Sequence, residues 1–426
     1  MKILVIGSGG REHAIIKSIK RNNRVKKIFA LPGNGGISRD AECVPVKANN
    51  IYAVTEFAVK EKIDYAVVAP DEPLAIGMTD ALEEKGIRCF GPGRLAARIE
   101  SSKVFSKNIM KKYGIPTAAY ETFSDHQKAA GYLKKDNIVF PAVIKADGLA
   151  LGKGVIIASD LNEALAAIND IMQEKKFGDS GSSIVIEEYL KGPEITVLAF
   201  TDGNCVVPMI SSMDHKRIYD GNRGPNTGGM GVIAPNPHYT EEIAKICEEK
   251  IFLPTIKALK AEGCKFKGCL YFGLMLTEKG PMVIEYNARF GDPEAQAVLS
   301  LLETDLLEIM EAVTDERLNE IEIRWKKNNE RSFCCTACVI LASGGYPSSY
   351  KTGFKISGLE SGETSGVTIF HSGTEYRDGS FYTAAGRVLG VTALGPTPES
   401  ALNSAYSAAD TIKFENIYFR KDIGKY

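Results

Sequence analysis

The sequence has 426 residues, more than a single hydrophobic core usually supports, so several domains are expected. Its 44% hydrophobic and 25% charged content is ordinary for a globular protein, and a formal net charge of -1 excludes a broad basic surface for nucleic acid or anionic membranes. No stretch approaches the roughly 20 apolar residues of a membrane span, and the amino terminus lacks a signal-peptide core. We therefore expect a cytoplasmic protein that binds neither nucleic acid nor membrane and recognises phosphate only locally.

Residues 1 to about 100 alternate short β-branched runs with amphipathic stretches. The runs KILVIG, KKIFAL, YAVVA and IRCFGP predict strands, and helices are predicted from about Glu12, over Val54 to Lys62 and over Leu74 to Lys85. This alternation predicts a parallel sheet with helices on both faces. We expect residues 1–102 to form a doubly wound α/β domain.

A first glycine cluster, GSGG, follows the first predicted strand and includes Gly9 and Gly10. Backbone amides at the start of a helix suit an anionic group. Glu12 occupies the third glycine position of the dinucleotide fingerprint, and the second strand is followed by no acidic residue placed for a ribose hydroxyl. A phosphate site is therefore favoured over a nicotinamide site, with a purely structural turn as the alternative.

A domain boundary is predicted near Ser101, where a lysine-rich helix begins that stops at Gly114. Residues 140–200 then predict strand, glycine-rich loop, strand, helix, strand and strand, with Asp160 and Glu163 forming a capping box. Further helices are predicted from Thr240 to about Glu262 and near Pro293, around two strands, CLYFGLML and PMVIEYN. These elements predict an α+β core over 103–325.

The second glycine cluster, IKADGLALGKGVII, contains Gly152, Lys153 and Gly154. A P-loop needs four residues between its glycines and a helix after the lysine, whereas only three separate Gly148 from Gly152 and the run VII favours a strand. The pattern predicts a hairpin, not a P-loop. Lys153 and Lys145 on such a hairpin can neutralise a triphosphate, although a surface hairpin with structural glycines is the alternative.

The strand IVIEEYLKGPE becomes acidic at Glu187 and Glu188. Two interpretations explain the pair equally well. One is an exposed strand end, and the other is a hinge that presents its backbone to adenine and Glu194 to ribose hydroxyls. The segment from about 205 to 235 is expected to be a long loop, and its DHKR and GPNTGGMG parts suit a small zwitterion and a phosphate. A solvated loop is the alternative for that segment.

The segment VIEYNARFGDPEAQ carries polar residues at spacing two. In a strand Glu285 and Asn287 face the same side, and paired oxygens beside a triphosphate suit Mg²⁺. Arg289 is then placed to hold a phosphate, and Asp292-Pro293 is expected to cap the following helix. A strand end followed by a helix cap is the structural alternative.

The remainder, residues 326–426, predicts a small β-rich carboxy-terminal domain with one helix from Pro398 to Thr411. The nine cysteines are expected to be reduced, and the run from Cys334 to Cys338 is interpreted as buried core thiols rather than a zinc site. Of the histidines, His126, His238 and His371 lie in no recognisable constellation, and no Ser or Cys nucleophile is paired with His and Asp.

Taken in order, these elements resemble the ATP-grasp superfamily. Within it, GSGGREHA, IKADGLALGKGV, IEEYLKGPE, DHKR, GPNTGGMG, EYNARFGDPE, AGRVLGVTALG and RKDIG are similar to the glycinamide ribonucleotide synthetase family over the whole chain. The resemblance implies an ATP-dependent ligation of glycine to 5-phosphoribosylamine, with ATP and Mg²⁺ or Mn²⁺. Glycyl phosphate is the implied intermediate, glycinamide ribonucleotide, ADP and phosphate the products, de novo purine biosynthesis the setting, and a monomer or weak homo-oligomer the state.

The resemblance also implies a substrate-binding domain over 1–102 and a two-lobed ATP-grasp core over 103–325, with a lid subdomain at about 120–190. It further implies roles for individual residues. The nucleotide is expected to contact Lys107, Lys145, Gly152, Lys153, Gly154, Glu187, Glu188, Tyr189, Leu190 and Glu194. The substrates are expected to contact Gly9, Gly10, Asp71, Glu72, Asp214, Lys216, Arg217, Asn226, Thr227, Gly228, Gly229, Arg289 and Asp292. Catalysis is assigned to Lys153, Arg289 and Asp214, and the metal to Glu285 and Asn287.

One departure affects the substrate set: the family typically has Gly-Pro-Glu where this chain has Ala69-Pro70-Asp71-Glu72, so either Asp71 or Glu72 supplies the acidic contact. Three other functions remain as alternatives. They are an ATP-grasp carboxylase or transformylase of nucleotide metabolism, a nicotinamide-dependent oxidoreductase, and a non-catalytic nucleotide sensor.

Overall fold

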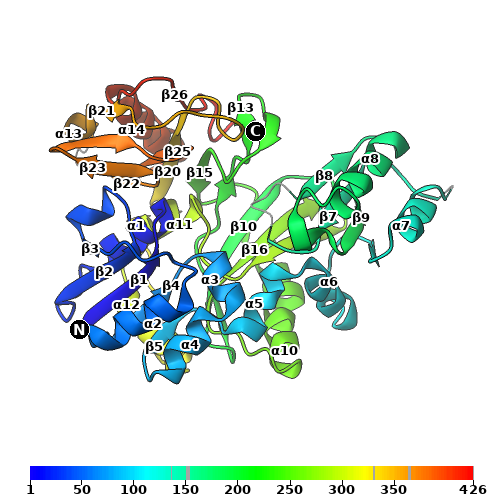
Figure 1. The fold of residues 1–426 in the computed structure, drawn as a ribbon, viewed down its shortest axis with the longest axis horizontal. Coiled ribbons are helices and arrows are strands. Elements are labelled where there is room, and N and C mark those ends of the chain that lie inside the picture. The colour runs from blue at the N-terminus through cyan, green and yellow to red at the C-terminus, as the bar shows by residue number, and fades with distance from the viewer. Residues whose placement is uncertain (136, 150–153, 330–331, 363–365, 426) are drawn as a thin grey trace.

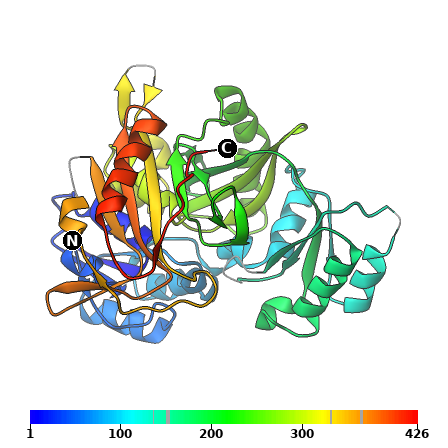
Figure 2. The same cartoon turned by 90° about the horizontal axis from the view of Figure 1, so that it is seen from above.

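The computed structural model describes residues 1–135, 137–149, 154–329, 332–362 and 366–425. An amino-terminal parallel-sheet domain lies below a β-rich carboxy-terminal domain, and a smaller lobe with β7, β8 and β9 stands at the far side of the molecule (Figure 1). The view from above shows the same separation of this lobe from the rest (Figure 2). Within the described ranges, no helix has the length and apolar character needed to cross a bilayer.

The amino-terminal domain is a five-stranded parallel sheet in the order β3-β2-β1-β4-β5. Successive side chains of a strand face opposite sides of the sheet. In β1, Ile3 and Val5 pack with α1, while Leu4 and Ile6 pack in the core that includes α2. The predicted doubly wound α/β fold is therefore confirmed. Its elements are β1 (Lys2–Gly7), α1 (Gly10–Ile19), β2 (Lys27–Pro32), β3 (Glu42–Cys43), α2 (Ile51–Lys60), β4 (Tyr65–Val68), α3 (Asp71–Ile76), α4 (Met78–Glu84), β5 (Arg88–Phe90) and α5 (Arg94–Ser101).

The helix predicted from Leu74 to Lys85 is wrong as a single element. It is two helices, α3 and α4, that meet at Gly77, whose φ of +95° lies in the left-handed region. Glycine adopts that conformation at little steric cost, so the chain turns there instead of continuing the helix.

The smaller lobe is an antiparallel sheet in the order β6-β9-β7-β8, covered by α7 and α8. Antiparallel pairing of β7 with β8 confirms the predicted hairpin around the second glycine cluster. The Asp160 carboxylate caps α8 by accepting the N–H of Glu163, as predicted. The second bond of the predicted capping box differs, because Glu163 accepts the N–H of Ser159 instead of that of Asp160. The elements are α6 (Lys103–Lys112), β6 (Tyr120–Phe123), α7 (His126–Leu133), β7 (Ala142–Ala146), β8 (Val155–Ala158), α8 (Leu161–Met172) and β9 (Ile184–Glu188).

The larger lobe is an antiparallel sheet in the order β11-β10-β16-β17. The helix predicted from Thr240 is present, but it contains a π-turn at Glu248–Phe252. Pro254 follows this turn and lacks the N–H that a regular helix would use there. The elements are β10 (Glu194–Thr201), β11 (Val206–Pro208), α9 (Glu241–Cys247), α10 (Leu253–Ala261), β16 (Gly268–Thr277), β17 (Gly280–Asn287), α11 (Glu294–Val298), the 3-10 turn η4 (Leu299–Leu301) and α12 (Leu306–Thr314).

The carboxy-terminal sheet has the order β12-β15-β20-β25-β22, with β26 also pairing β20. The loop predicted over about 205–235 is wrong in part, because this sheet recruits two of its segments as β12 and β15. Glycine content gave no sign of that long-range pairing. The elements are β12 (Met213–Asp214), β13 (Arg217–Tyr219), β14 (Arg223–Asn226), β15 (Gly231–Ala234), β18 (Lys327–Asn329), β19 (Ser332–Phe333), β20 (Cys335–Ser343), β21 (Lys355–Ile356), α13 (Leu359–Gly362), β22 (Val367–His371), β23 (Thr374–Arg377), β24 (Ser380–Thr383), β25 (Arg387–Gly395), α14 (Pro398–Thr411) and β26 (Ile417–Tyr418).

The cysteine-rich run lies in the centre of the carboxy-terminal sheet. Cys335 and Cys338 are buried in β20, and burial raises the pKa of the Cys338 thiol to about 12. Both thiols are therefore neutral core side chains, as predicted.

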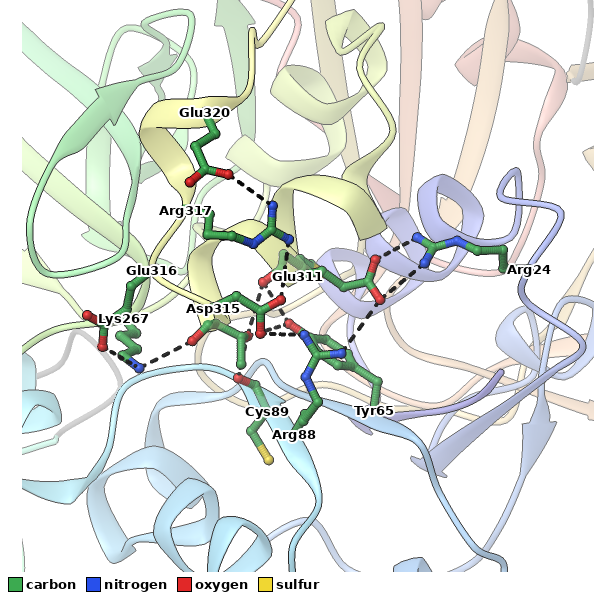
Figure 3. A network of polar contacts seen from close by, with 12 residues as sticks. Arg24, Tyr65, Arg88, Cys89, Lys267, Glu311, Asp315, Glu316, Arg317 and Glu320 are labelled. Atoms are coloured by element: carbon green, nitrogen blue, oxygen red, sulfur yellow. Dashed lines mark hydrogen bonds and ion pairs between the residues drawn. The ribbon is translucent and has the colours of Figure 1, made fainter.

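A polar network joins α12 to the amino-terminal sheet (Figure 3). The Tyr65 hydroxyl donates to the carbonyl of Met310 (2.8 Å) and lies 2.6 Å from the Thr314 hydroxyl. At its edge, the guanidinium of Arg24 pairs with Glu311 at 2.6 Å and that of Arg88 pairs with Asp315 at 2.6 Å. Tyr65 is fully buried, so the central bond of this network is shielded from water.

We expect Tyr65→Phe to lower the free energy of unfolding by about 1–2 kcal/mol, because it leaves the Met310 carbonyl and the Thr314 hydroxyl without this partner. Thermal unfolding of the full chain measures the change as a lower Tm. Tyr52→Phe, at a tyrosine that is 75% exposed, is the matched control and should leave Tm unaltered. Equal Tm values for the two variants would contradict a stabilising role for the Tyr65 hydroxyl.

Candidate functional site

The predicted substrate residues of the amino-terminal domain meet at one edge of its sheet. Gly9 and Gly10 follow β1, and Asp71 begins α3 after β4. In the order β3-β2-β1-β4-β5 the strand succession reverses between β1 and β4. Ligands of open α/β sheets bind outside the carboxyl ends of the strands at such a reversal. The topology therefore supports a binding site beside these three residues.

The turn after β1 is closely packed. A Cβ at Gly10 would collide with the Gln296 amide and the Ser372 hydroxyl, so only glycine fits there. The N–H of Gly9 donates to the Glu12 carboxylate at 2.6 Å. Glu12 occupies the third glycine position of the dinucleotide fingerprint. Because its carboxylate accepts the N–H of Gly9, that backbone amide is already bonded and does not face a bound anion.

Asp292 does not cap the following helix, contrary to the prediction. Its carboxylate accepts the backbone N–H of Arg11 in the first turn of α1 at 3.3 Å and the side-chain amide of Gln296 at 2.8 Å. It also pairs with Arg387 at 3.3 Å. The carboxylate reaches across to another helix because α1, distant in sequence, presents its positive end to the loop after β17.

Arg387, at the start of β25, was not singled out from the sequence. Its Nη1 donates to the carbonyls of Gly228 (2.6 Å) and Asp292 (2.7 Å). The carboxy-terminal domain therefore positions the GPNTGGMG segment against the loop after β17. The string AGRVLG contains this arginine, but no local pattern distinguishes it from a surface strand residue.

The charges of two acidic groups, Glu100 and Asp71, act on Arg289. Its Nη2 is 3.0 Å from the Glu100 carboxylate and 3.4 Å from the Asn287 amide oxygen. Burial raises the pKa of Glu100, and the charge of Asp71 adds to that effect. The Glu72 carboxylate instead accepts the side-chain amide of Asn49 at 3.1 Å. Of the two adjacent acidic residues, Asp71 is the one whose charge acts on Glu100 and Arg289.

A buried ion triad lies where the smaller lobe meets the larger one. The Glu187 carboxylate contacts Lys107 at 2.9 Å and Lys145 at 3.0 Å, and the side chains are at most 5% exposed. The interpretation of Glu187 as an exposed strand end is therefore wrong, because helix α6 covers it. Burial lowers the pKa of Lys107 to about 8, against the opposing charge of Glu187. Glu188 is exposed and accepts the N–H of Ala119 at 3.1 Å.

The predicted metal residues lie at the end of β17. Glu285 and Asn287 are both partly exposed, while Tyr286 between them is buried, so they share one face as predicted. Burial opposes the charge of Glu285, but Lys216 and Lys145 lead a group of cations that lower the pKa of this carboxyl. An ionised carboxylate beside an amide oxygen is a donor set that fits Mg²⁺.

Lys216 connects this face to the polar loop. Its Nζ lies 3.1 Å from Glu194 and 3.8 Å from Glu285. Nearby, the partly buried Asp214 and the buried Glu294 form an acidic pair: desolvation and the charge of Glu294 raise the pKa of Asp214 well above its usual value, against the attraction of Lys216. Two carboxyls whose charges act on each other disfavour a second negative charge and favour a cation near them.

The remaining predicted residues are placed as follows. Thr227 accepts the N–H of Gly229 at 3.0 Å and donates to the Lys216 carbonyl at 2.8 Å, which holds the loop next to the site. Arg217 and Asn226 pair with each other's strand in the hairpin β13–β14, where Arg217 donates to Gly224. Tyr189 and Leu190 continue the chain after Glu188. Gly152 and Lys153 lie outside the described residues, next to Gly154.

His371 makes a long-range contact through its backbone. Its backbone N–H donates to Nδ1 of His13 at 2.9 Å, and His13 Nε2 lies 3.1 Å from Asp40. Since Nδ1 accepts, His13 holds its proton on Nε2 and faces the carboxylate with it. The contact joins residues 358 positions apart, which no local spacing reveals.

Several buried polar atoms around the site make no hydrogen bond to another described residue. They include Asp214 Oδ1, Arg289 Nε and Ser372 Oγ. Buried polar atoms are usually paired, so such atoms mark places where a polar ligand or water completes the bonding. They surround the turn at Gly10 and the end of β17, where the predicted substrate residues meet.

Comparison with known proteins assigns all three parts of the chain. Profiles of phosphoribosylglycinamide synthetase match residues 1–100 (N domain), 101–295 (ATP-grasp (A) domain) and 336–426 (C domain). Phosphoribosylamine--glycine ligases of Caldanaerobacter subterraneus subsp. tengcongensis and Clostridium acetobutylicum are 48% and 45% identical. The alignments cover 99% of both chains in the first case and 100% in the second.

A solved structure shows the same arrangement. The crystal structure of phosphoribosylamine--glycine ligase from Thermotoga maritima superposes with a TM-score of 0.84 at 31% identity and covers 100% of both chains. The chain is similar to these proteins throughout its length.

The low pKa of Lys107 predicts that nucleotide affinity falls as the pH rises. The ammonium group is charged below about pH 8 and neutral above it, and only the charged form attracts a triphosphate. We expect the dissociation constant of a non-hydrolysable ATP analogue to rise about tenfold between pH 7 and pH 9. Equilibrium fluorescence titration across this range measures it.

Lys107→Arg should flatten the profile, because arginine stays protonated. Lys111→Arg, at an exposed position of the same helix, is the control and should keep the original profile. A profile that is identical in all three proteins would remove Lys107 from the nucleotide site.

Proposed function

The chain belongs to the phosphoribosylglycinamide synthetase family, and we propose that separate groups of the side chains described above bind ATP, glycine and 5-phosphoribosylamine for the ATP-dependent joining of the last two. It is an ATP-grasp ligase that uses ATP with Mg²⁺ and acts on small molecules. The observation that carries this proposal is the series of charged side chains from the buried pair of Lys107 and Glu187, through the partly exposed Glu285, to Arg289. It connects the two lobes with the amino-terminal sheet.

The nucleotide is assigned to the two lobes. Lys107 and Lys145 neutralise its phosphates, and the segment from Glu187 to Leu190, with Glu188, presents backbone to adenine. Glu194 reaches the ribose, and Lys153 with Gly152 and Gly154 covers the phosphates from the hairpin. Glu285 and Asn287 hold Mg²⁺, which neutralises the triphosphate when it is bound. These roles rest on the buried ion triad of Lys107, Lys145 and Glu187 and on the ionised Glu285.

Glycine is assigned to the space between Asp214 and Arg289. The acidic pair of Asp214 and Glu294 suits the glycine ammonium group, and Arg289 suits its carboxylate. The carboxylate oxygen attacks the γ-phosphorus of ATP, and the bond from this phosphorus to ADP breaks. The product is glycyl phosphate, an acyl phosphate beside Arg289.

Phosphoribosylamine is assigned to the amino-terminal sheet edge. Gly9, Gly10 and Asp71 lie there, and Asp292 with Gly228 and Gly229 closes it from the core. The amine nitrogen attacks the acyl carbon, a C–N bond forms, phosphate leaves and a proton passes from nitrogen to solvent. Asp71 is proposed as the acidic contact to the amine in preference to Glu72. No nucleophile of the protein is needed, because catalysis consists of positioning and charge neutralisation.

We propose that residues 1–102, 103–325 and 326–426 form the three domains, with the lid at about 120–190. We also propose that the chain is a cytoplasmic monomer or weak homo-oligomer that acts in de novo purine biosynthesis.

Release of phosphate from ATP should require glycine, phosphoribosylamine and Mg²⁺ together, because the acyl phosphate is discharged only by the amine. A coupled phosphate assay on the pure chain, with phosphoribosylamine generated in place, measures the requirement. Bicarbonate and formate are the matched alternatives to glycine, and each should give only background. Phosphate release with bicarbonate or formate in place of glycine would assign the chain to another ATP-grasp reaction.

Asp214→Asn should raise KM for glycine about 100-fold, because it removes one of the two carboxyl groups proposed to face the ammonium group and leaves only Glu294. Steady-state kinetics at saturating ATP measures it, and KM for ATP should change far less. Asp170→Asn, at an exposed position of α8, is the control. An unchanged KM for glycine in Asp214→Asn would refute the assignment.

A further inference from the structure

A cavity of about 370 Å³ lies beside α1, towards the end of that helix opposite Gly9 and Gly10. Residues Lys17 to Arg21 form one wall, Thr368 and Phe370 of β22 another, and η4 a third. Ser18 is eight residues beyond Gly10, a rise of about 12 Å along a helix. None of the residues assigned above to nucleotide or substrate lines this cavity.

Basic side chains dominate its lining. The described lining residues include three basic side chains, Lys17, Lys20 and Arg21, and a single carboxylate, Asp40. Burial opposes the charge of Asp40, yet hydrogen bonds from His13 and Lys20 outweigh it and hold the pKa of this carboxyl well below its usual value. Its one negative charge is therefore already shared among several donors.

Arg21 forms no ion pair within the described part of the chain. A further cation lies near it: Lys326, whose Nζ donates to the Ser300 carbonyl at 2.9 Å. Burial lowers the pKa of Lys326, and the positive charge of Arg21 lowers it further. Lys326 lies beside Ser300, which lines the cavity, so an anion bound next to Arg21 would be stabilised by both positive charges.

Besides Asp40, two further acidic side chains lie close to the cavity. Glu303 and Asp305 line a narrower groove that shares Ser18 and Arg21 with the cavity. The Asp305 carboxylate is occupied, since it accepts the N–H groups of Leu307 and Glu308 at the start of α12. The balance of charge inside the cavity is therefore positive.

The rest of the lining suits a small polar body. Phe370, Leu299 and Ala14 are apolar, while Ser18, Ser300 and Thr368 carry hydroxyls. Ligand pockets commonly have about 300 to 1,000 Å³, so 370 Å³ is enough for a molecule of sugar-phosphate size.

We propose that this cavity is a second binding site, separate from the catalytic one, for a small phosphate-bearing molecule of sugar-phosphate size. The phosphate pairs with Arg21 and the neighbouring lysines, and the uncharged part lies against Phe370 and Leu299. Binding contributes contacts to all three domains at once, because α1, η4 and β22 each supply a wall.

Calorimetric titration of the full chain with ribose 5-phosphate tests the proposal. A non-hydrolysable ATP analogue and glycine are present at saturation, so that binding at the catalytic site is the same in every variant. We expect a binding event that Arg21→Ala weakens at least about tenfold, since a charge-assisted bond is lost. Arg21→Lys should retain most of it, and unphosphorylated ribose should not produce it.

Lys85→Ala removes one positive charge from the same domain outside the cavity, and it should bind like the original protein. Crystals soaked with ribose 5-phosphate should show the phosphate beside Arg21. Isotherms that are identical for the original chain and Arg21→Ala would overturn the proposal, and so would soaked crystals with ligand at the catalytic site alone. Because Arg21 is exposed and lies outside the catalytic site, phosphate release should be retained in Arg21→Ala. A failure of the second binding site can therefore be distinguished from a failure of the ligase assignment.

Discussion

The Asp292 carboxylate is the interaction on which the arrangement of the site depends. It accepts the N–H of Arg11 at the start of α1 and pairs with Arg387 of the carboxy-terminal sheet, while its own backbone belongs to the larger lobe. One buried anion therefore holds three domains in register. Burial opposes its charge, but Arg387 and Arg11 keep the pKa of this carboxyl below its usual value, so it is ionised at neutral pH. The positive end of a helix adds to that stabilisation.

The charges around the site alternate, and this has an energetic reason. A buried charge is costly unless a partner compensates it. Here each anion has a cation beside it: Glu187 has two lysines, Glu285 has Lys216, and Glu100 has Arg289. The exception is the pair of Asp214 and Glu294, where the raised pKa records an imbalance that a bound ammonium group would correct. Sites prepared for a charged substrate are expected to carry such an imbalance.

Much of the fold could be predicted, because local periodicity and local breaks specify it. The parallel sheet, the hairpin over the second glycine cluster and the helix Pro398–Thr411 follow from patterns within a few residues. The errors share a different cause. Gly77 divides a helix through a backbone conformation that an apolar pattern does not reveal. β12 pairs with β15, and β15 pairs with β20, about a hundred residues away. Pairing over such distances depends on tertiary packing.

By itself the sequence determined the chemistry of the site: which segments carry lysine, glycine and paired oxygens, that the glycine hairpin is not a P-loop, and which family the order of motifs resembles. The tertiary structure decided which of these groups meet. It placed the Asp292 carboxylate on the backbone of α1 without capping α11, and it brought Arg387 to Gly228. It also joined the backbone of His371 to His13 and paired the carboxylate of Glu72 with Asn49. The physical reason is that side-chain type and spacing act locally, whereas buried charges choose partners only after the domains have packed against one another.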